Sequence, residues 1–201
     1  GAVRRGLALK KAGNAIMDLV GGREIHPVNI RLGGFYRVPT VAEIRALAPD
    51  LDWAIGASRE AADWVAGFPF PEADMDYELV SVRTPEGYPL APGRIASSRG
   101  IDIAPTAFDD TFEEIHKPHS TALHSVVRER GTYLTGPIAR LALNHGRLAP
   151  LASEVTEAAG IERLARNPFT SILVRSIEIL HACEEAARLV RAYEGADAPA
   201  V

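Results

Sequence analysis

The stretch RRGLALKKAGNAIMDLVGGREIHPVNIRLGGFY, residues 4–36, joins a helical pattern to a loop rich in glycine. Apolar side chains recur near one helical stripe within residues 3–20; they are Val3, Leu7, Ile16 and Val20. This spacing predicts an amphipathic helix. Gly21-Gly22 predicts where the helix ends, because glycine readily adopts the left-handed conformation that closes many helices.

The segment that follows, residues 23–39, is predicted to be an ordered loop. Proline resists helix continuation, and the pair Gly33-Gly34 permits backbone angles closed to other residues. Two roles are open for this loop. It can have a purely structural role, by capping the helix and crossing a tight gap. It can also hold Arg23 and His26 toward a partner or a cofactor, where an imidazole N–H can hydrogen-bond to sulfur or oxygen.

Beyond this loop, Thr40 and Glu43 form a capping-box pattern that predicts the start of a further helix, to about residue 48. A second helical stretch is predicted to run to about residue 66, with Trp53, Ala57, Ala61 and Trp64 on one face. Proline and acidic side chains make residues 67–75 a connector. Residues 77–104 alternate and contain glycine turns, which predicts a small antiparallel β unit.

Helical patterns return after residue 149, with a short helix predicted over residues 153–165 and a long one over 170–193. The long helix carries a regular apolar stripe: Leu173, Ile177, Leu180, Cys183, Ala187 and Val190. The chain is therefore predicted to be mainly α with a small antiparallel β unit, an α+β protein. We expect one domain over residues 1–201, helical in 1–66, β-rich in 77–104, and loop and helical in 105–201.

Composition excludes several classes of protein. The chain has 201 residues, 47% of them hydrophobic, and a net charge of -4, which gives no general attraction for nucleic acid. No apolar run is long enough to span a bilayer. Its single cysteine, Cys183, rules out an internal disulfide framework or a metal site built from several cysteines. A cytoplasmic protein is the expectation.

Other residues with chemical potential favour structural roles. His116, His119 and His124 invite a metal site, but their spacing does not place them on one helical face, and Pro118 interrupts a helix. Loop hydrogen bonding is the favoured interpretation for them. Cys183 lies within an apolar stripe, which indicates a buried small hydrophobe rather than a nucleophile.

Four runs resemble the large, or alpha, subunit of nickel–iron hydrogenases, closest to the soluble nucleotide-linked branch. They are residues 4–36, YPLAPGRIASSRGIDI (88–103), HSTALHSVVRERGTYLTGPIARLALN (119–144) and SIEILHACEEAARLV (176–190). The resemblance keeps the family's order along nearly the whole chain. It implies the central part of the large-subunit fold and, for the parent enzyme, reversible oxidation of dihydrogen to protons and electrons, linked to NAD(P).

The same resemblance implies which groups belong to this segment. The family holds its nickel–iron centre with four cysteines in two C-x-x-C pairs, and neither pair is present here. No catalytic, cofactor-binding or metal-binding residue is therefore assigned, and we expect a fragment that is inactive alone. His26, with Arg23, Gly33 and Gly34 shaping its loop, is expected to face the small subunit and its iron–sulfur cluster.

The partners implied are the hydrogenase small subunit and diaphorase-type electron-transfer subunits. Apolar surface left uncovered would also favour self-association of the fragment. Two alternatives stay open: a metal-free scaffold or interaction homologue, and a relative of the quinone-side subunit of respiratory complex I. The run GPIARLALN, residues 136–144, resembles the hydrogenases more than the complex I subunit.

Overall fold

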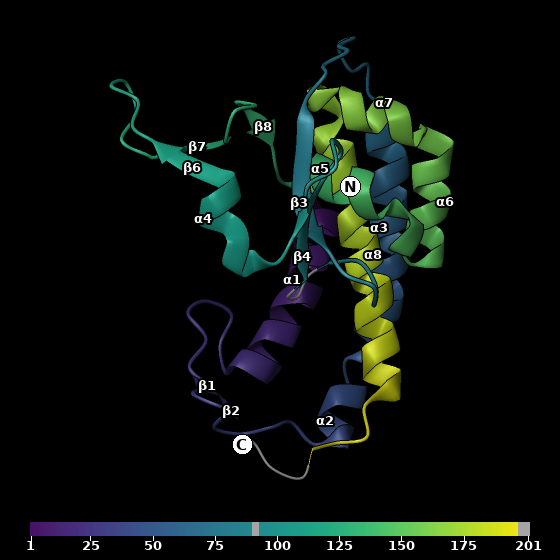
Figure 1. The fold of residues 1–201 in the computed structure, drawn as a ribbon. Helices are drawn as coiled ribbons and strands as arrows, with labels where there is room; N and C mark the ends of the chain where they lie inside the picture. Colours follow the sequence, from purple (N-terminus) through teal and green to yellow (C-terminus); the bar gives the residue numbers. More distant parts are fainter. Residues whose placement is uncertain (90–92, 197–201) are drawn as a thin grey trace. The chain divides into compact units, whose positions relative to one another are not determined.

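A computed structural model describes residues 1–89 and 93–196 (Figure 1). The predicted β unit includes residues 90–92, and the C-terminal tail includes residues 197–201, so these parts of the predictions lie outside the described residues. The described chain is mainly helical with small, largely antiparallel sheets, which confirms the predicted fold class.

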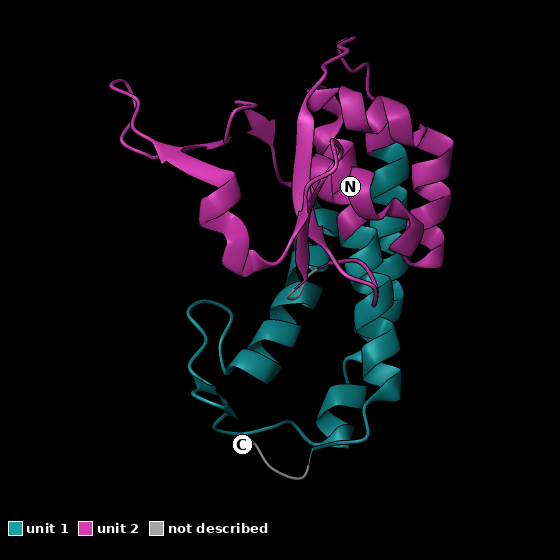
Figure 2. Ribbon diagram, in the orientation of Figure 1, with its two compact units in different colours: residues 1–64, 179–201 teal, residues 65–178 magenta. Residues whose placement is uncertain are grey.

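The chain divides into two compact units (Figure 2). Unit 1 comprises residues 1–64 and 179–201, and unit 2 comprises residues 65–178. The division falls within two long helices, α3 (Ala48–Ala66) and α8 (Ser171–Ala192). The expectation of a single domain stays a prediction.

Unit 1 begins with helix α1 (Ala2–Gly21), as predicted. The segment predicted as a loop contains a small hairpin, in which β1 (Ile30–Arg31) pairs antiparallel with β2 (Gly34–Phe35). Only two residues separate the strands, and the second of them, Gly33, has a φ of 82°. Glycine adopts this angle without steric cost, so the turn can be this tight.

Helix α2 (Val41–Arg45) starts at the predicted capping box, with Thr40 and Glu43 bonded reciprocally. The core of unit 1 is formed by Ile44, Leu51, Ala187 and Val190, with partly buried residues of α1 packed against it. On α3, the predicted face of Trp53, Ala57, Ala61 and Trp64 is not the buried one throughout. Trp53 and Trp64 are 44% and 62% exposed, whereas the buried face carries smaller side chains. Helical periodicity alone does not show which of two apolar stripes faces the core.

Unit 2 contains a four-stranded sheet in the order β5-β4-β3-β8. Its antiparallel part confirms the predicted β unit: β3 (Glu78–Arg83), β4 (Arg94–Ser97) and β5 (Asp102–Ile103). Strand β8 (Tyr133–Leu134) was not predicted, and it adds to β3 in parallel. A two-residue strand has too little sequence for a period-two pattern to be recognised.

A second hairpin in unit 2 pairs β6 (Phe112–Ile115) with β7 (His124–Val127). It follows the short helices η1 (Pro105–Ala107) and α4 (Phe108–Thr111). Phe112 is buried, stacks on Phe108 and meets Tyr133 edge-on, so the base of the hairpin belongs to the core. The prediction of loop in this region missed these strands.

The helices of unit 2 differ from prediction in two places. Helix α5 (Pro137–Asn144) was not predicted, although Pro137 stands in its first turn, where proline is well tolerated. The helix predicted over residues 153–165 is two helices, α6 (Pro150–Ala159) and α7 (Ile161–Arg166), separated by Gly160. Two 3-10 turns, η2 (His145–Arg147) and η3 (Pro168–Thr170), complete the path to α8.

An ion cluster ties distant segments of unit 2 together. Arg140 on α5 donates two hydrogen bonds to the Glu178 carboxylate, from Nε at 2.7 Å and from a terminal nitrogen at 2.8 Å. The Tyr88 hydroxyl donates a third, also at 2.8 Å. Burial, and then the adjacent Glu178 carboxylate, raise the pKa of Tyr88 well above its usual range. The two-pronged geometry makes this pair stronger than a single-contact ion pair.

Candidate functional site

The loop after α1 is folded tightly against the end of that helix. Gly22 has a φ of 82°, and its N–H donates to the Asp18 carbonyl at 2.9 Å, which closes the helix as predicted. The Gly21 carbonyl then accepts hydrogen bonds from two loop amides, at 2.9 and 3.0 Å. A methyl group on Gly21 would lie 3.1 Å from Pro27 Cβ. Glycine at residue 21 therefore permits this close return of the chain.

Asn29 fixes the middle of the loop through its side chain. Its Nδ2 donates to the Val20 carbonyl at 2.8 Å and to the Arg37 carbonyl at 2.6 Å. Its Oδ1 accepts from the Arg37 N–H at 2.9 Å, and its main-chain carbonyl accepts from the Tyr36 N–H at 2.9 Å. One side chain thus joins the end of α1 to both sides of the hairpin. Sequence reasoning did not identify Asn29, because its partners are eight and nine residues away.

The four residues assigned by resemblance all lie in this loop. His26 is exposed and has a φ of 53°, a left-handed conformation that is uncommon for residues other than glycine. Arg23 Nε donates to the His26 carbonyl at 2.6 Å, so the structure brings these two residues together. Gly33 and Gly34 have φ angles of 82° and 151° and form the hairpin turn and the start of β2.

The same loop exposes large apolar side chains, which the sequence reasoning missed. Their exposed fractions are 70% for Ile25, 54% for Val28, 59% for Ile30, 97% for Leu32 and 66% for Tyr36. Leu32 stands at the hairpin tip, next to Gly33. Five exposed apolar side chains in one loop favour a surface that contacts another molecule.

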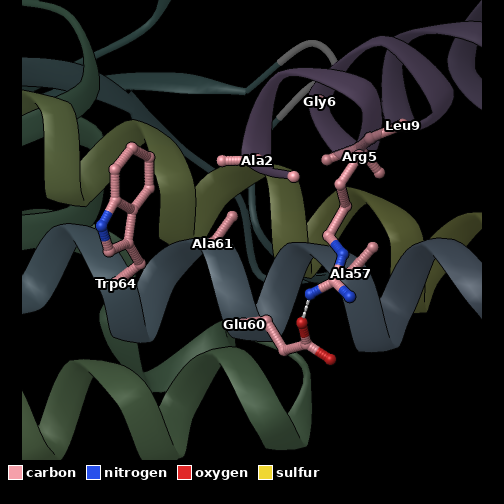
Figure 3. A pocket seen from close by; sticks show the side chains of 9 residues that line it. Ala2, Arg5, Gly6, Leu9, Ala57, Glu60, Ala61 and Trp64 are labelled. Atoms are coloured by element: carbon pink, nitrogen blue, oxygen red, sulfur yellow. Dashed lines mark ion pairs between the residues drawn. The ribbon is translucent and has the colours of Figure 1, made fainter.

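Unit 1 also contains a cavity of about 520 Å³ between α1 and α3 (Figure 3). Its lining includes the ion pair of Arg5 with Glu60 and the exposed ring of Trp64. The remaining lining residues are small or apolar: Gly1, Ala2, Gly6, Leu9, Ala57 and Ala61. The Glu60 carboxylate is held in its ion pair with Arg5, and the lining contains neither a cysteine nor a histidine.

The histidines and the cysteine considered from sequence belong to elements other than this loop. The rings of His119 and His124 meet edge-on with centroids 6.1 Å apart, at the hairpin of β6 and β7. Cys183 is half-buried, and burial raises the pKa of its thiol. Among the described residues, no group of three or more His, Cys, Asp or Glu side chains is placed to hold a metal ion.

In residues 1–89 and 93–196, none of the helices combines the length and the apolar character that crossing a bilayer requires.

Comparison with solved structures defines the class of fold. The chain superposes on a chain of an NAD+-reducing [NiFe]-hydrogenase in the H2-reduced state with a TM-score of 0.84, over 99% of this chain and 49% of that one, at 19% identity. It superposes on the reduced Ni-Fe-Se hydrogenase of D. vulgaris Hildenborough with a TM-score of 0.60, over 97% of this chain and 50% of that one, at 13% identity. The fold is therefore that of part of a nickel–iron hydrogenase large subunit, as the resemblance predicted.

Sequence comparison gives particular relatives. The chain is 28% identical to sulfhydrogenase 1 subunit alpha of Pyrococcus furiosus over 187 residues, and 28% identical to sulfhydrogenase 2 subunit alpha of the same organism over 188 residues. These matches cover 92% and 94% of this chain, which is thus related to hydrogenase alpha subunits. It spans 43% of the length of each relative. No protein-family model matches the chain.

The residues present do not fit the metal centre for which these hydrogenases are named. The resemblance implies four cysteine thiolates as ligands of that centre, whereas this chain has one cysteine. Cys183 lies on α8, and its thiol is hydrogen-bonded to Ser58. A half-buried thiol with a raised pKa is a poor thiolate ligand at neutral pH. One cysteine among these 201 residues cannot supply four thiolate ligands.

Proposed function

We propose that this chain is the central portion of the large subunit of a nickel–iron hydrogenase and supplies scaffold and partner-binding surface rather than metal ligands. The parent reaction would be the reversible oxidation of dihydrogen to protons and electrons, linked to NAD(P). The chain by itself is expected to be inactive. The observation that carries the proposal is the superposition over 99% of the chain, joined to a sequence match with hydrogenase alpha subunits over 92%.

The partner implied by this proposal is the hydrogenase small subunit, together with diaphorase-type electron-transfer subunits. The name "subunit alpha" of the relatives supports assembly with other chains. The NAD+-reducing activity of the structural neighbour supports a nucleotide acceptor and, with it, a cytoplasmic location. The reported likenesses are all hydrogenases, which favours this function over a complex I relative or a metal-free scaffold.

His26 is proposed to face the small subunit and its iron–sulfur cluster, with Arg23, Gly33 and Gly34 shaping the loop around it. The exposure of His26 supports this role, because its ring is free to approach a partner. The left-handed backbone of His26 also supports this role. Strained backbone conformations that neighbouring residues hold in place are common at functional sites. The Arg23 hydrogen bond to the His26 carbonyl maintains that geometry.

The proposal is tested with the complete reading frame that contains this segment, produced together with the neighbouring subunit genes. The complete complex should bind about one nickel per large subunit and reduce a viologen dye and NAD+ with dihydrogen. The 201-residue chain should bind far less than one nickel and show no turnover. Stoichiometric nickel in the 201-residue chain, or a complete complex without dihydrogen-dependent reduction, would overturn the proposal.

The role of His26 has its own test in the same complex. Replacing His26 with alanine should change the reduction potential or the paramagnetic resonance spectrum of the iron–sulfur cluster nearest the interface, because a hydrogen bond to the cluster environment tunes it. His119→Ala is the matched control, since His119 is also an exposed loop histidine. Identical spectra for His26→Ala and the unmodified complex would remove His26 from this role.

A further inference from the structure

Two histidines meet at the tip of the hairpin that β6 and β7 form (Figure 1). His119 and His124 are exposed, and the centroids of their rings lie 6.1 Å apart with the ring planes at 88° to each other. Within residues 1–89 and 93–196, no hydrogen bond joins either ring to another protein group. The loop hydrogen bonding expected for these two rings is thus absent from the described chain, and their nitrogens are available as ligands.

The backbone of the tip fixes the position from which His119 projects. Residues 117–120 form a turn that the Ser120 N–H closes by donating to the Lys117 carbonyl at 3.0 Å. Pro118 occupies the second position of this turn, which proline favours because its φ is already set near the required value. The Ser120 hydroxyl donates to the Ala122 carbonyl at 3.0 Å and accepts from the Ala122 N–H at 3.1 Å. His119 therefore belongs to a closed turn.

The strand register separates the third histidine of this segment from the other two. Ile115 pairs with His124, so these two side chains lie on one face of the hairpin. His116 follows Ile115 directly, and its side chain leaves from the other face because successive side chains of an extended chain alternate. The ring of His119 contacts that of His124. Two histidines converge here, which agrees with the absence of any group of three or more metal-ligand side chains among the described residues.

The spacing of the two rings suits a single metal ion. An imidazole nitrogen binds zinc at about 2.0–2.1 Å, which places the ring centre about 3 Å from the ion. Two rings that bind one ion therefore have centres about 5–6 Å apart, and the observed 6.1 Å lies near the upper end of that range. Because His119 and His124 are exposed, rotation about their side-chain bonds aims one nitrogen of each ring at the ion without moving the backbone.

We propose that His119 and His124 form a two-histidine site for a divalent transition-metal ion at the tip of the β6–β7 hairpin. Neutral imidazole is a common ligand of zinc, nickel and copper, whereas magnesium and calcium prefer oxygen. Water takes the remaining coordination positions, because the tip is exposed, and the bound ion is therefore exchangeable. Glu113, on the same face two residues before Ile115, is not assigned as a ligand because it forms an ion pair with Arg128 at 3.3 Å. The inference is independent of the proposed function, since both ligands belong to this chain.

The test titrates zinc chloride into the complete protein that contains this segment, after dialysis against a chelator. Replacing His119 or His124 with alanine should weaken zinc binding at least about tenfold, since even the loss of a hydrogen-bond partner of a metal ligand costs about 10–100-fold. His116→Ala is the matched control, because His116 is an exposed histidine on the other face of the same hairpin, and its zinc affinity should stay within about twofold of the unmodified protein. Magnesium chloride should not bind. Circular dichroism establishes that each variant is folded.

Hydrogen exchange locates the ion. The Ser120 amide exchanges when the turn opens, and opening separates the two ligands. Bound zinc should therefore slow this exchange about tenfold at a zinc concentration ten times the Kd, and His119→Ala and His124→Ala should abolish the slowing while His116→Ala keeps it.

Three results would overturn the inference and leave the proposed function intact. The first is zinc affinity that is equal in His119→Ala and the unmodified protein, including no binding by either at millimolar zinc. The second is an equal loss of affinity in His116→Ala and His119→Ala. The third is zinc binding that leaves the Ser120 exchange rate unchanged, which would place the ion elsewhere.

Discussion

Replacing Asn29 with alanine should release the hairpin loop without unfolding the rest of unit 1. The substitution removes three side-chain hydrogen bonds, two donated by Nδ2 and one accepted by Oδ1. A hydrogen bond contributes about 0.5–1.5 kcal/mol. We take about 1 kcal/mol for the part-buried bond to the Val20 carbonyl and about 0.5 for each exposed bond to Arg37. The loop should therefore lose about 2 kcal/mol of local stability.

Hydrogen exchange measures this loss directly. The N–H groups of Tyr36 and Arg37 are bonded to Asn29 in the folded loop, so their exchange reports its opening. Because 1.4 kcal/mol corresponds to a factor of ten, the Tyr36 amide should exchange about thirtyfold faster in Asn29→Ala. Amides in the middle of α8 should keep their rates, because the core of unit 1 does not include the loop.

The matched control is Asn14→Ala. Asn14 makes one exposed side-chain hydrogen bond, to Glu24 at 2.8 Å, so its loss should change the Tyr36 exchange rate by less than about threefold. The reasoning is refuted if Asn29→Ala and Asn14→Ala have the same effect on Tyr36. It is also refuted if Asn29→Ala lowers global stability while leaving the loop amides protected.

Further predictions concern backbone strain, pH and thiol reactivity. Gly22→Ala should destabilise the protein by about 1–2 kcal/mol in urea unfolding, because alanine must take a left-handed φ of 82° and its methyl would lie 3.1 Å from a Val28 methyl. The raised pKa of Tyr88 means that its contribution to stability is fully present below the unfolded value near 10 and is lost as pH rises above that value. Tyr88→Phe should therefore flatten the alkaline decline in stability, and an unchanged decline would contradict this. Cys183 should react with a disulfide reagent at pH 8 at least about tenfold more slowly in the folded chain than in urea, because burial raises the pKa of its thiol.

Much of the helical structure could be predicted from short-range patterns. The Thr40–Glu43 capping box and the glycine ending of α1 are confirmed, and so is the apolar stripe of α8 apart from Cys183, which is half-buried. Each depends on residues within about one or two turns of one another, so the sequence contains the information directly. The predictions failed where elements were short or interrupted, as at β8 and at Gly160 between α6 and α7.

The candidate site was only partly accessible from sequence. The two glycine pairs indicated an unusual loop in the sequence. The roles of His26 and Arg23 come from the resemblance and stay predictions. The exposure of Leu32 could not be predicted, because an apolar residue beside short strands is as compatible with a core as with a surface. The Asn29 bonds were hidden for the same reason, since an asparagine in a loop has many potential partners.

The sequence by itself determined the helices with strong periodicity and the residues that cap them. It also determined that the chain has one cysteine, which cannot supply four thiolate ligands. Only the tertiary structure decided which surfaces are uncovered, which strands pair, and that Glu178 meets Tyr88 across 90 residues of chain. The reason is physical. Helix propensity and capping act between neighbours in sequence, whereas burial, strand pairing and ion clusters depend on which distant segments folding brings into contact.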